Sequence, residues 1–227
     1  MARPQAATRT RPTRRSTRSP RPTLVLCVRH GRTSTTGQVL PGRAPGLHLS
    51  DEGRRQAEHV AARIGALGNV DAVYASPLER TRETAAPIAR AVGHRVRTAR
   101  GLLECDFGSW TGRRLADLRK LPEWHAVQHS PSTFRFPGGE SFTEMQARMW
   151  DQLLTLAAAH PGGTIVAASH ADPIKAAVAV AAGIHLDLFQ RTSISPCSVT
   201  ALLLGAGTPL VLCTNSTGDD LSGLSPS

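Results

Sequence analysis

Three apolar runs in the sequence are each followed closely by arginine or histidine. The pairs are Leu24–Val28 with Arg29 and His30, Asp71–Ser76 with Arg80, and Thr164–Ser169 with His170. Arginine forks match phosphate oxygens and stay charged at ordinary pH. A histidine among arginines is a poor cation, but as a neutral imidazole it can accept a phosphoryl group. These residue types therefore point to phosphoryl transfer.

A phosphoryl transfer also needs an acid, because the leaving alkoxide must be protonated. Glu104 and Asp106 are the candidates, since both lie in an otherwise apolar segment. Gly31, directly after His30, lets the backbone pass close to a ligand. Two arginines around one point would neutralise a dianion and stabilise the charge on the transferring group.

The elements that must position these side chains follow from the hydrophobic pattern. The three apolar runs have the length and continuity of strands buried on both faces. Ser50 is the predicted N-cap of the first helix, and Pro77 is predicted in the first turn of the second. The remaining pattern predicts helices over 77–92, 141–159 and 173–182, two short helices within 113–137, and a hairpin of 198–204 with 209–213.

Strands that alternate with helices predict a mostly parallel sheet covered by helices on both faces. In such sheets ligands bind beyond the carboxyl ends of the strands. Each predicted strand delivers polar groups to that rim, so we expect Arg29, His30, Arg80 and His170 to converge there. The pattern therefore predicts one small anion site with a histidine in it.

The charge of the chain is concentrated at its N-terminus. The 227 residues carry a formal net charge of +10, and residues 1–22 contain seven arginines and no acidic residue. Such a segment cannot bury enough apolar surface to order itself. It could bind nucleic acid by counterion release, but no aromatic residues interleave the arginines as stacking platforms. We predict a disordered basic tail, or a start codon assigned too far upstream, and no nucleic-acid partner.

The rest of the chain suits one domain, predicted over residues 23–215, with a second disordered tail over 216–227. No apolar run approaches the ~18 residues of a membrane span, and no secretory signal is evident. The four cysteines lack metal-site spacing, and His125 and His129 have no evident third ligand. We therefore expect reduced thiols, no metal and a cytoplasmic location, while the oligomeric state stays open.

Five segments together resemble the histidine phosphatase superfamily, in its phosphoglycerate mutase-like branch. They are Leu24–Gly31, Ala75–Ala85, Glu104–Gly112, Phe136–Ser141 and Ser169–Asp172. They occur in the family's order, and the resemblance spans residues 24 to about 213. Residues 42–49 and 185–191 further resemble an actinobacterial branch whose members carry phosphatase or phosphomutase names. The resemblance implies a three-layer α/β/α sandwich with a mostly parallel sheet, and neither a metal nor an organic cofactor.

The resemblance also implies a role for each matching residue. The implied catalytic residues are His30 as the phosphorylated nucleophile, Arg29, Arg80 and His170 as the rest of the phosphate pocket, and Glu104 as the proton donor. Glu104 matches the first position of the family's E-x-x-x-G-x-W-x-G pattern, so we favour it over Asp106. The stretch 113–137 would cap the site and help to select the substrate.

Three positions depart from the mutases of this family. Thr36 stands where they carry an asparagine that helps to bind phosphate, Ala171 stands where glycine is usual, and Arg32 stands where glutamate is frequent. We keep Thr36 and Ala171 as candidate substrate-binding residues. The departures favour a phosphatase acting on a small phosphorylated metabolite. A phosphomutase is the first alternative, and a non-catalytic phospholigand-binding protein is the second.

Overall fold

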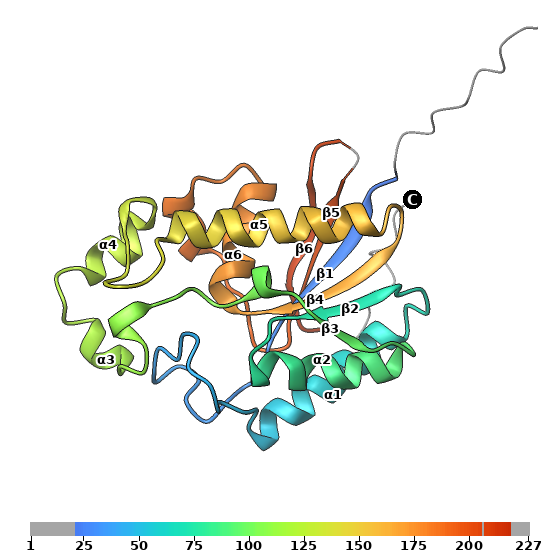
Figure 1. The fold of residues 1–227 in the computed structure, drawn as a ribbon, viewed down its shortest axis with the longest axis horizontal. Coiled ribbons are helices and arrows are strands. Elements are labelled where there is room, and N and C mark those ends of the chain that lie inside the picture. Colours follow the sequence, from blue (N-terminus) through green and yellow to red (C-terminus); the bar gives the residue numbers. More distant parts are fainter. Residues whose placement is uncertain (1–20, 206, 219–227) are drawn as a thin grey trace, which may run out of the picture.

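A computed structural model describes residues 21–205 and 207–218 (Figure 1). Its single mixed sheet has the strand order β3-β2-β4-β1-β5-β6. The strands are β1 (Thr23–Arg29), β2 (Ala72–Ala75), β3 (Val96–Thr98), β4 (Thr164–Ser169), β5 (Val199–Leu204) and β6 (Leu210–Ser216). Strands β1 to β4 are parallel to one another, whereas β5 pairs antiparallel with both β1 and β6. The predicted basic tail lies almost wholly outside the described residues.

Helices cover both faces of this sheet, as Figure 1 shows. The helices are α1 (Asp51–Gly65), α2 (Glu79–Ala91), α3 (Leu115–Leu118), α4 (Trp124–His129), α5 (Phe142–Ala159) and α6 (Ala171–Ala181). Helices α1 and α2 share one apolar core with the sheet, and α5 and α6 share a second core on its other face. The predicted three-layer α/β/α sandwich is confirmed.

Strand β1 lies at the centre of both cores, which explains its continuous apolar sequence. Leu24, Leu26 and Val28 face the core of α1 and α2, whereas Val25 and Cys27 face the core of α5 and α6. A strand that is buried on both faces has no position for a polar side chain until it ends. The change to polar residues at Arg29 therefore marks the carboxyl end of the strand, at the rim of the sheet.

The helix starts show which local signals were correct. Ser50 caps α1 as predicted, since its Oγ accepts a hydrogen bond from the Gly53 amide at 3.1 Å. Pro77 is not in the first turn of α2, because the helix begins at Glu79 with Leu78 as its N-cap. Helix α6 begins at Ala171, two residues before the predicted start. Pro173 fits inside its first turn, because amides there need no helical acceptor.

Two strand predictions also need correction. Strand β3 was not predicted, because Val96–Thr98 is a short, largely exposed edge strand without an apolar run. Strand β6 ends at Ser216 rather than Cys213, and so passes the predicted domain end at residue 215. Its extra residues carry polar side chains, and the backbone amide of Asn215 donates to the Thr200 hydroxyl at 3.2 Å. A polar end of this kind leaves no hydrophobic signal.

The stretch 113–137 contains the two predicted short helices, α3 and α4, followed by a 3-10 turn at Pro131–Thr133. Its apolar side chains join a third core with α5 and α6, which includes Leu118, Val127 and Phe136. In Figure 1 this segment lies beside one end of the sheet. No helix in the described part of the chain is long and apolar enough to cross a membrane.

Candidate active site

The parallel register brings three strand ends together at the rim. Arg29 in β1 is paired with Ser169 in β4, and Ala75 in β2 is paired with Ala168 in β4. His30 and His170 follow these strand ends directly, and their ring centroids lie 5.2 Å apart. Both imidazoles are buried. The expected convergence of two histidines at one rim is therefore present.

The hydrogen bonding of His30 defines which of its ring nitrogens can react. Nδ1 lies 2.8 Å from the carbonyl oxygen of Gly31. A carbonyl can only accept, so Nδ1 carries the hydrogen and Nε2 keeps its lone pair. Burial, and then the charges of Arg80 and Arg29, lower the pKa of His30 to about 3. The imidazole is thus neutral at pH 7, as a nucleophile must be.

Arg80 supplies buried donors that the protein itself does not use. Its side chain is fully buried and donates from Nη2 to the Gly42 carbonyl at 2.8 Å. Its Nε and Nη1 have no hydrogen-bond partner among residues 21–205 and 207–218. A buried donor without a partner costs free energy, so these groups are ready for an acceptor such as a phosphate oxygen.

Arg29 resembles Arg80 in this respect. Its Nη1 donates to the Ile194 carbonyl at 2.6 Å, while its buried Nε has no hydrogen-bond partner within the described residues. Burial lowers the pKa of both guanidinium groups, and the charge of Glu104 opposes that shift. Guanidinium groups start from so high a pKa that both remain cations at neutral pH.

His170 is held by a residue at the end of β2. Its Nε2 lies 3.0 Å from the Ser76 hydroxyl, and its buried Nδ1 has no hydrogen-bond partner in the described structure. Burial, followed by the charges of Arg80 and His30, lowers its pKa well below the usual range. His170 is therefore a neutral neighbour of His30, with one ring nitrogen left for a ligand.

Glu104 lies in this group, and Asp106 does not. A Glu104 carboxylate oxygen is 3.9 Å from His170 Nδ1, and the other accepts from the Cys105 amide at 3.0 Å. Burial, and then the charge of Asp172, raise the pKa of Glu104 to about 7. Near neutral pH a large fraction of Glu104 thus holds a proton that it can donate.

Asp106 has a different environment from its neighbour. Its side chain is 42% exposed and forms an ion pair with Arg43 at 3.6 Å. It also accepts a hydrogen bond from the Gly108 amide at 3.0 Å, which orders the turn. We therefore assign Asp106 to the structure of the loop rather than to the chemistry.

A cavity of about 350 Å³ opens over the cluster and is lined in part by Arg29, His30 and Glu104. Thr36 and Ala171 also line it. The Thr36 hydroxyl accepts from the Thr33 amide at 2.8 Å, so it is already engaged in the loop. Ala171 is the first residue of α6, and amides at a helix start suit anions. Both candidate substrate-binding residues thus border the cavity.

Several residues that border the cavity were not identified from the sequence. Lys175 in α6 donates to Asp172 at 3.3 Å and to the Gln190 side chain at 2.9 Å. Asp172 and Lys175 are one helical turn apart, a spacing that places them on one face of a helix. That spacing was a usable signal for these two residues, whereas Gln190 has no such signal.

The histidine pair of α4 is not part of this cluster. The rings of His125 and His129 stack with centroids 4.2 Å apart. Their side chains are exposed, and His129 bonds to the carbonyl of His125 at 3.1 Å. Among the residues that the structure describes, no group of three or more histidine, cysteine or acidic side chains is arranged to hold a metal ion.

The site combines a neutral buried histidine with guanidinium donors that have no partner within the described residues, at the carboxyl ends of the strands. This combination fits proteins that bind or transfer phosphoryl groups. The profile of the histidine phosphatase superfamily (branch 1) matches residues 25–217. The chain belongs to this superfamily, which confirms the resemblance noted above.

Similar curated proteins include some with phosphatase names and some with phosphoglycerate mutase names. The chain is 33% identical over 176 residues to a bifunctional protein of Mycobacterium tuberculosis, which covers 74% of this chain and 48% of that protein. It is 32% identical over 153 residues to phosphoserine phosphatase 1 of Hydrogenobacter thermophilus, which covers 65% of this chain and 72% of that one. The chain thus spans about half the length of its mycobacterial relative.

Solved structures share the fold. Phosphoserine phosphatase of Entamoeba histolytica, in complex with 3-phosphoglyceric acid, is 26% identical with a TM-score of 0.78, covering 88% of this chain and all of that chain (100%). The mycobacterial glucosyl-3-phosphoglycerate phosphatase has a TM-score of 0.78 at 23% identity, covering 87% of this chain and 100% of that one. The similarity to these structures shows that the fold is shared.

Proposed function

We propose that the chain hydrolyses phosphate monoesters of small metabolites through a phosphohistidine at His30. The single observation that carries the proposal is the bond from His30 Nδ1 to Gly31 at 2.8 Å, which leaves Nε2 unprotonated. The unpartnered donors of Arg29 and Arg80 lie in the same buried cluster. A lone pair beside fixed cationic donors suits attack on a phosphate dianion.

In the first step His30 Nε2 forms a bond to phosphorus as the ester P–O bond breaks. The electron pair of that bond goes to the leaving oxygen, which takes the proton of Glu104 and departs as an alcohol. Arg29, Arg80 and His170 hold the three other phosphoryl oxygens. Because these donors are fixed before the reaction, they need no reorganisation when charge develops.

In the second step a water molecule attacks the phosphohistidine. Glu104, now ionised, takes a proton from that water, and the N–P bond breaks with its electron pair returning to Nε2. Inorganic phosphate leaves, and both His30 and Glu104 are back in their starting states. The two steps need neither a metal nor an organic cofactor.

The composition of the cavity favours substrates with one anionic group. Lys175 is already paired with Asp172 at 3.3 Å, and Arg119 is exposed at the cavity wall. An exposed ion pair contributes about 1 kcal/mol or less. Val39, Leu40 and Trp124 supply apolar wall around the site. A second anion on the substrate would therefore lack a buried cation that is not already paired, which favours a phosphatase over a phosphoglycerate-type mutase.

This composition predicts the outcome of two matched substrate pairs. We expect kcat/KM for glycerol 3-phosphate to exceed that for 3-phosphoglycerate, and phosphoethanolamine to exceed phosphoserine, by roughly tenfold to a hundredfold. In the first pair a carboxylate replaces a hydroxymethyl group, and in the second it replaces a hydrogen, so the two ratios together report the cost of the carboxylate. Phosphate release and the formation of 2-phosphoglycerate are measured together. Faster formation of the isomer than of phosphate would support the mutase instead.

The charge of Asp172 should set the pH range of activity. Burial is the largest cause of the raised pKa of Glu104, and Asp172 is the next. We expect Asp172→Asn to lower that pKa and to move the alkaline limb of the kcat/KM profile to lower pH, because the acid form of Glu104 is the active one. The control is Asp151→Asn on the exposed side of α5, which should leave the profile unchanged. An unmoved limb in Asp172→Asn would contradict this electrostatic coupling.

The cysteines and the basic tail bear on location and partners. The four cysteines are unpaired, and Cys27, Cys105 and Cys197 are buried. Burial raises the pKa of Cys27 and Cys197 to about 12, so both stay unreactive thiols. We propose a cytoplasmic location on this basis.

The alternative of a non-catalytic protein whose tail binds nucleic acid makes a different prediction. Such a protein would shift random DNA in a gel, and the shift would be lost when residues 1–22 are deleted.

A further inference from the structure

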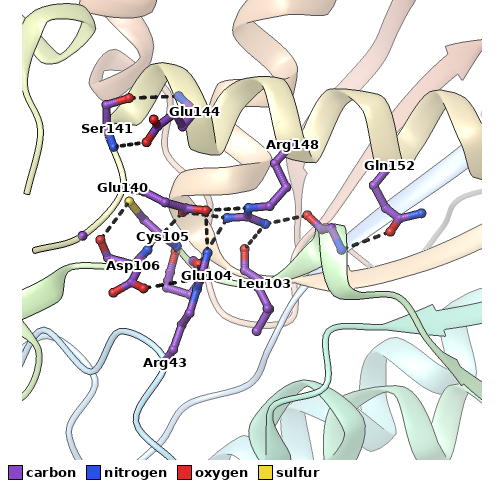
Figure 2. Close-up of polar contacts among 12 residues, drawn as sticks. Arg43, Leu103, Glu104, Cys105, Asp106, Glu140, Ser141, Glu144, Arg148 and Gln152 are labelled. Atoms are coloured by element: carbon purple, nitrogen blue, oxygen red, sulfur yellow. Dashed lines mark hydrogen bonds and ion pairs between the residues drawn. The ribbon is translucent and has the colours of Figure 1, made fainter.

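Arg43, Glu140 and Arg148 form a charged cluster around the backbone of Glu104 (Figure 2). Glu140, just before α5, is its centre. Arg148 in α5 donates to the two Glu140 oxygens from Nε at 2.9 Å and from Nη2 at 3.0 Å. Arg43, in the loop after β1, forms an ion pair with the same carboxylate at 2.7 Å. None of these three side chains lines the cavity described above.

Both arginines also bind the backbone of the segment that carries Glu104. Arg43 donates from Nε to the Glu104 carbonyl at 2.8 Å, and Arg148 donates to the same carbonyl at 3.3 Å. Arg148 further donates to the carbonyls of Gly101 at 2.7 Å and Leu103 at 3.0 Å. Two guanidinium groups held by one carboxylate thus fix three carbonyls next to the acid.

Glu140 also contacts this segment directly, because it accepts from the Asp106 amide at 3.1 Å. The side chain of Glu140 is only 18% exposed, and burial on its own would raise its pKa. The hydrogen bonds and charge of Arg148, together with the hydrogen bonds from the Asp106 amide and from Arg43, outweigh the burial and hold that pKa below its usual range. The Glu140 carboxylate therefore stays charged at neutral pH, where the enzyme would work.

We propose that Glu140 is a positioning residue for the proton transfer by Glu104. It holds Arg43 and Arg148 in place, and they in turn fix the backbone from which the Glu104 side chain reaches the site. This inference rests on the proposed function, since it concerns the proton that Glu104 gives to the leaving group. A displacement of about 1 Å in a reacting group can cost up to 100-fold in rate.

A positioning role has a signature that a purely structural role lacks. Proton donation matters for a poor leaving group such as the alkoxide of glycerol 3-phosphate, and little for 4-nitrophenolate, which leaves as an anion. A displaced Glu104 should therefore slow the first substrate and spare the second. Loss of folded enzyme would lower the activity toward both substrates by the same factor.

The test is Glu140→Gln, with kcat/KM measured on both substrates. Gln places an amide donor against the guanidinium donors and removes the shared charge. We expect kcat/KM for glycerol 3-phosphate to fall roughly 10- to 100-fold, and that for 4-nitrophenyl phosphate to fall by less than about threefold. In Arg43→Met, which keeps the pair of Glu140 with Arg148, we expect the same pattern with a smaller loss.

The matched control is Glu144→Gln, the same substitution four residues away. Glu144 pairs with Arg135 and completes the N-terminal capping box of α5 with Ser141. Its loss should destabilise α5 but leave the ratio of the two activities unchanged.

Equal losses on both substrates in Glu140→Gln and Arg43→Met would overturn the proposal, and so would no loss in either variant. Failure of the proposed function would look different. In that case the wild type itself would hydrolyse 4-nitrophenyl phosphate without phosphorylation of His30. If Glu140→Gln does not fold, Arg43→Met alone decides, through the same ratio.

Discussion

His30→Ala should lower kcat/KM for every phosphate monoester by about 10⁴-fold or more, since removing one member of a protease catalytic triad costs about 10⁴- to 10⁶-fold in kcat. The reason is local, because His30 Nε2 is the group with a free lone pair beside the unpartnered donors of Arg29 and Arg80. Those donors survive the substitution. Inorganic phosphate should therefore still bind, and binding should be measured by calorimetry alongside phosphate release.

A matched histidine variant separates loss of the nucleophile from loss of structure. His94 is exposed, and its Nε2 bonds to the Val70 carbonyl at 2.8 Å, away from the cavity. His94→Ala should keep nearly full activity. A His30→Ala enzyme that retains more than about a tenth of the wild-type activity would show that the chemistry does not pass through His30.

Glu104→Gln is expected to have the second largest effect. With alkyl phosphates kcat/KM should fall about 10²- to 10⁴-fold, the usual contribution of a general acid. With 4-nitrophenyl phosphate kcat/KM should change much less, because that leaving group needs no proton. In the wild type the pKa of about 7 for Glu104 predicts that activity falls as pH rises through 7. This alkaline limb should disappear in Glu104→Gln.

The same pKa predicts that the stability of the folded protein, like its activity, falls as the pH rises. In the folded protein the pKa of Glu104 is about 7, whereas its usual value is 4.5. The folded state therefore binds the proton more tightly, and its stability falls as pH rises from 4.5 through 7. Glu104→Gln removes this loss, so its melting temperature relative to wild type should rise between pH 5 and pH 8. If the difference in melting temperature between the variant and the wild type did not change with pH, Glu104 would not be a buried acid with a raised pKa.

The sequence predicts the centre of the site well because its signals are local. Arg29, His30 and His170 follow directly after apolar runs, and parallel strands bring such ends together. Arg80 is the second residue of α2, five residues after the end of β2. For these four residues, the one feature that the local sequence does not show is the order of the strands in the sheet.

Glu104 is harder to predict, because it lies in an irregular segment with no repeating pattern. The residues alone left it equal to Asp106, and the family resemblance favoured it. In the structure the two carboxyl groups differ by burial, with Glu104 buried and the Asp106 side chain 42% exposed. Burial of one loop carboxylate rather than its neighbour depends on tertiary packing, which no local pattern records.

The cluster of Arg43, Glu140 and Arg148 lies beyond any local signal. Its members come from three segments, and Arg43 is nearly a hundred positions before Glu140 in the sequence. Each side chain on its own is typical of a solvated surface residue. Only the fold shows that they share one carboxylate behind the acid, as Figure 2 illustrates.

The most direct test of the central claim is to trap the phosphorylated enzyme. Glu104→Gln should be mixed rapidly with 4-nitrophenyl phosphate carrying labelled phosphorus and then quenched. Phosphorylation proceeds with this leaving group, while water attack is slowed without the Glu104 base, so the intermediate should accumulate with a burst of nitrophenol. We expect an acid-labile, alkali-stable label on the peptide that contains His30. Nitrophenol release without labelled protein, or a label on another residue, would contradict the account.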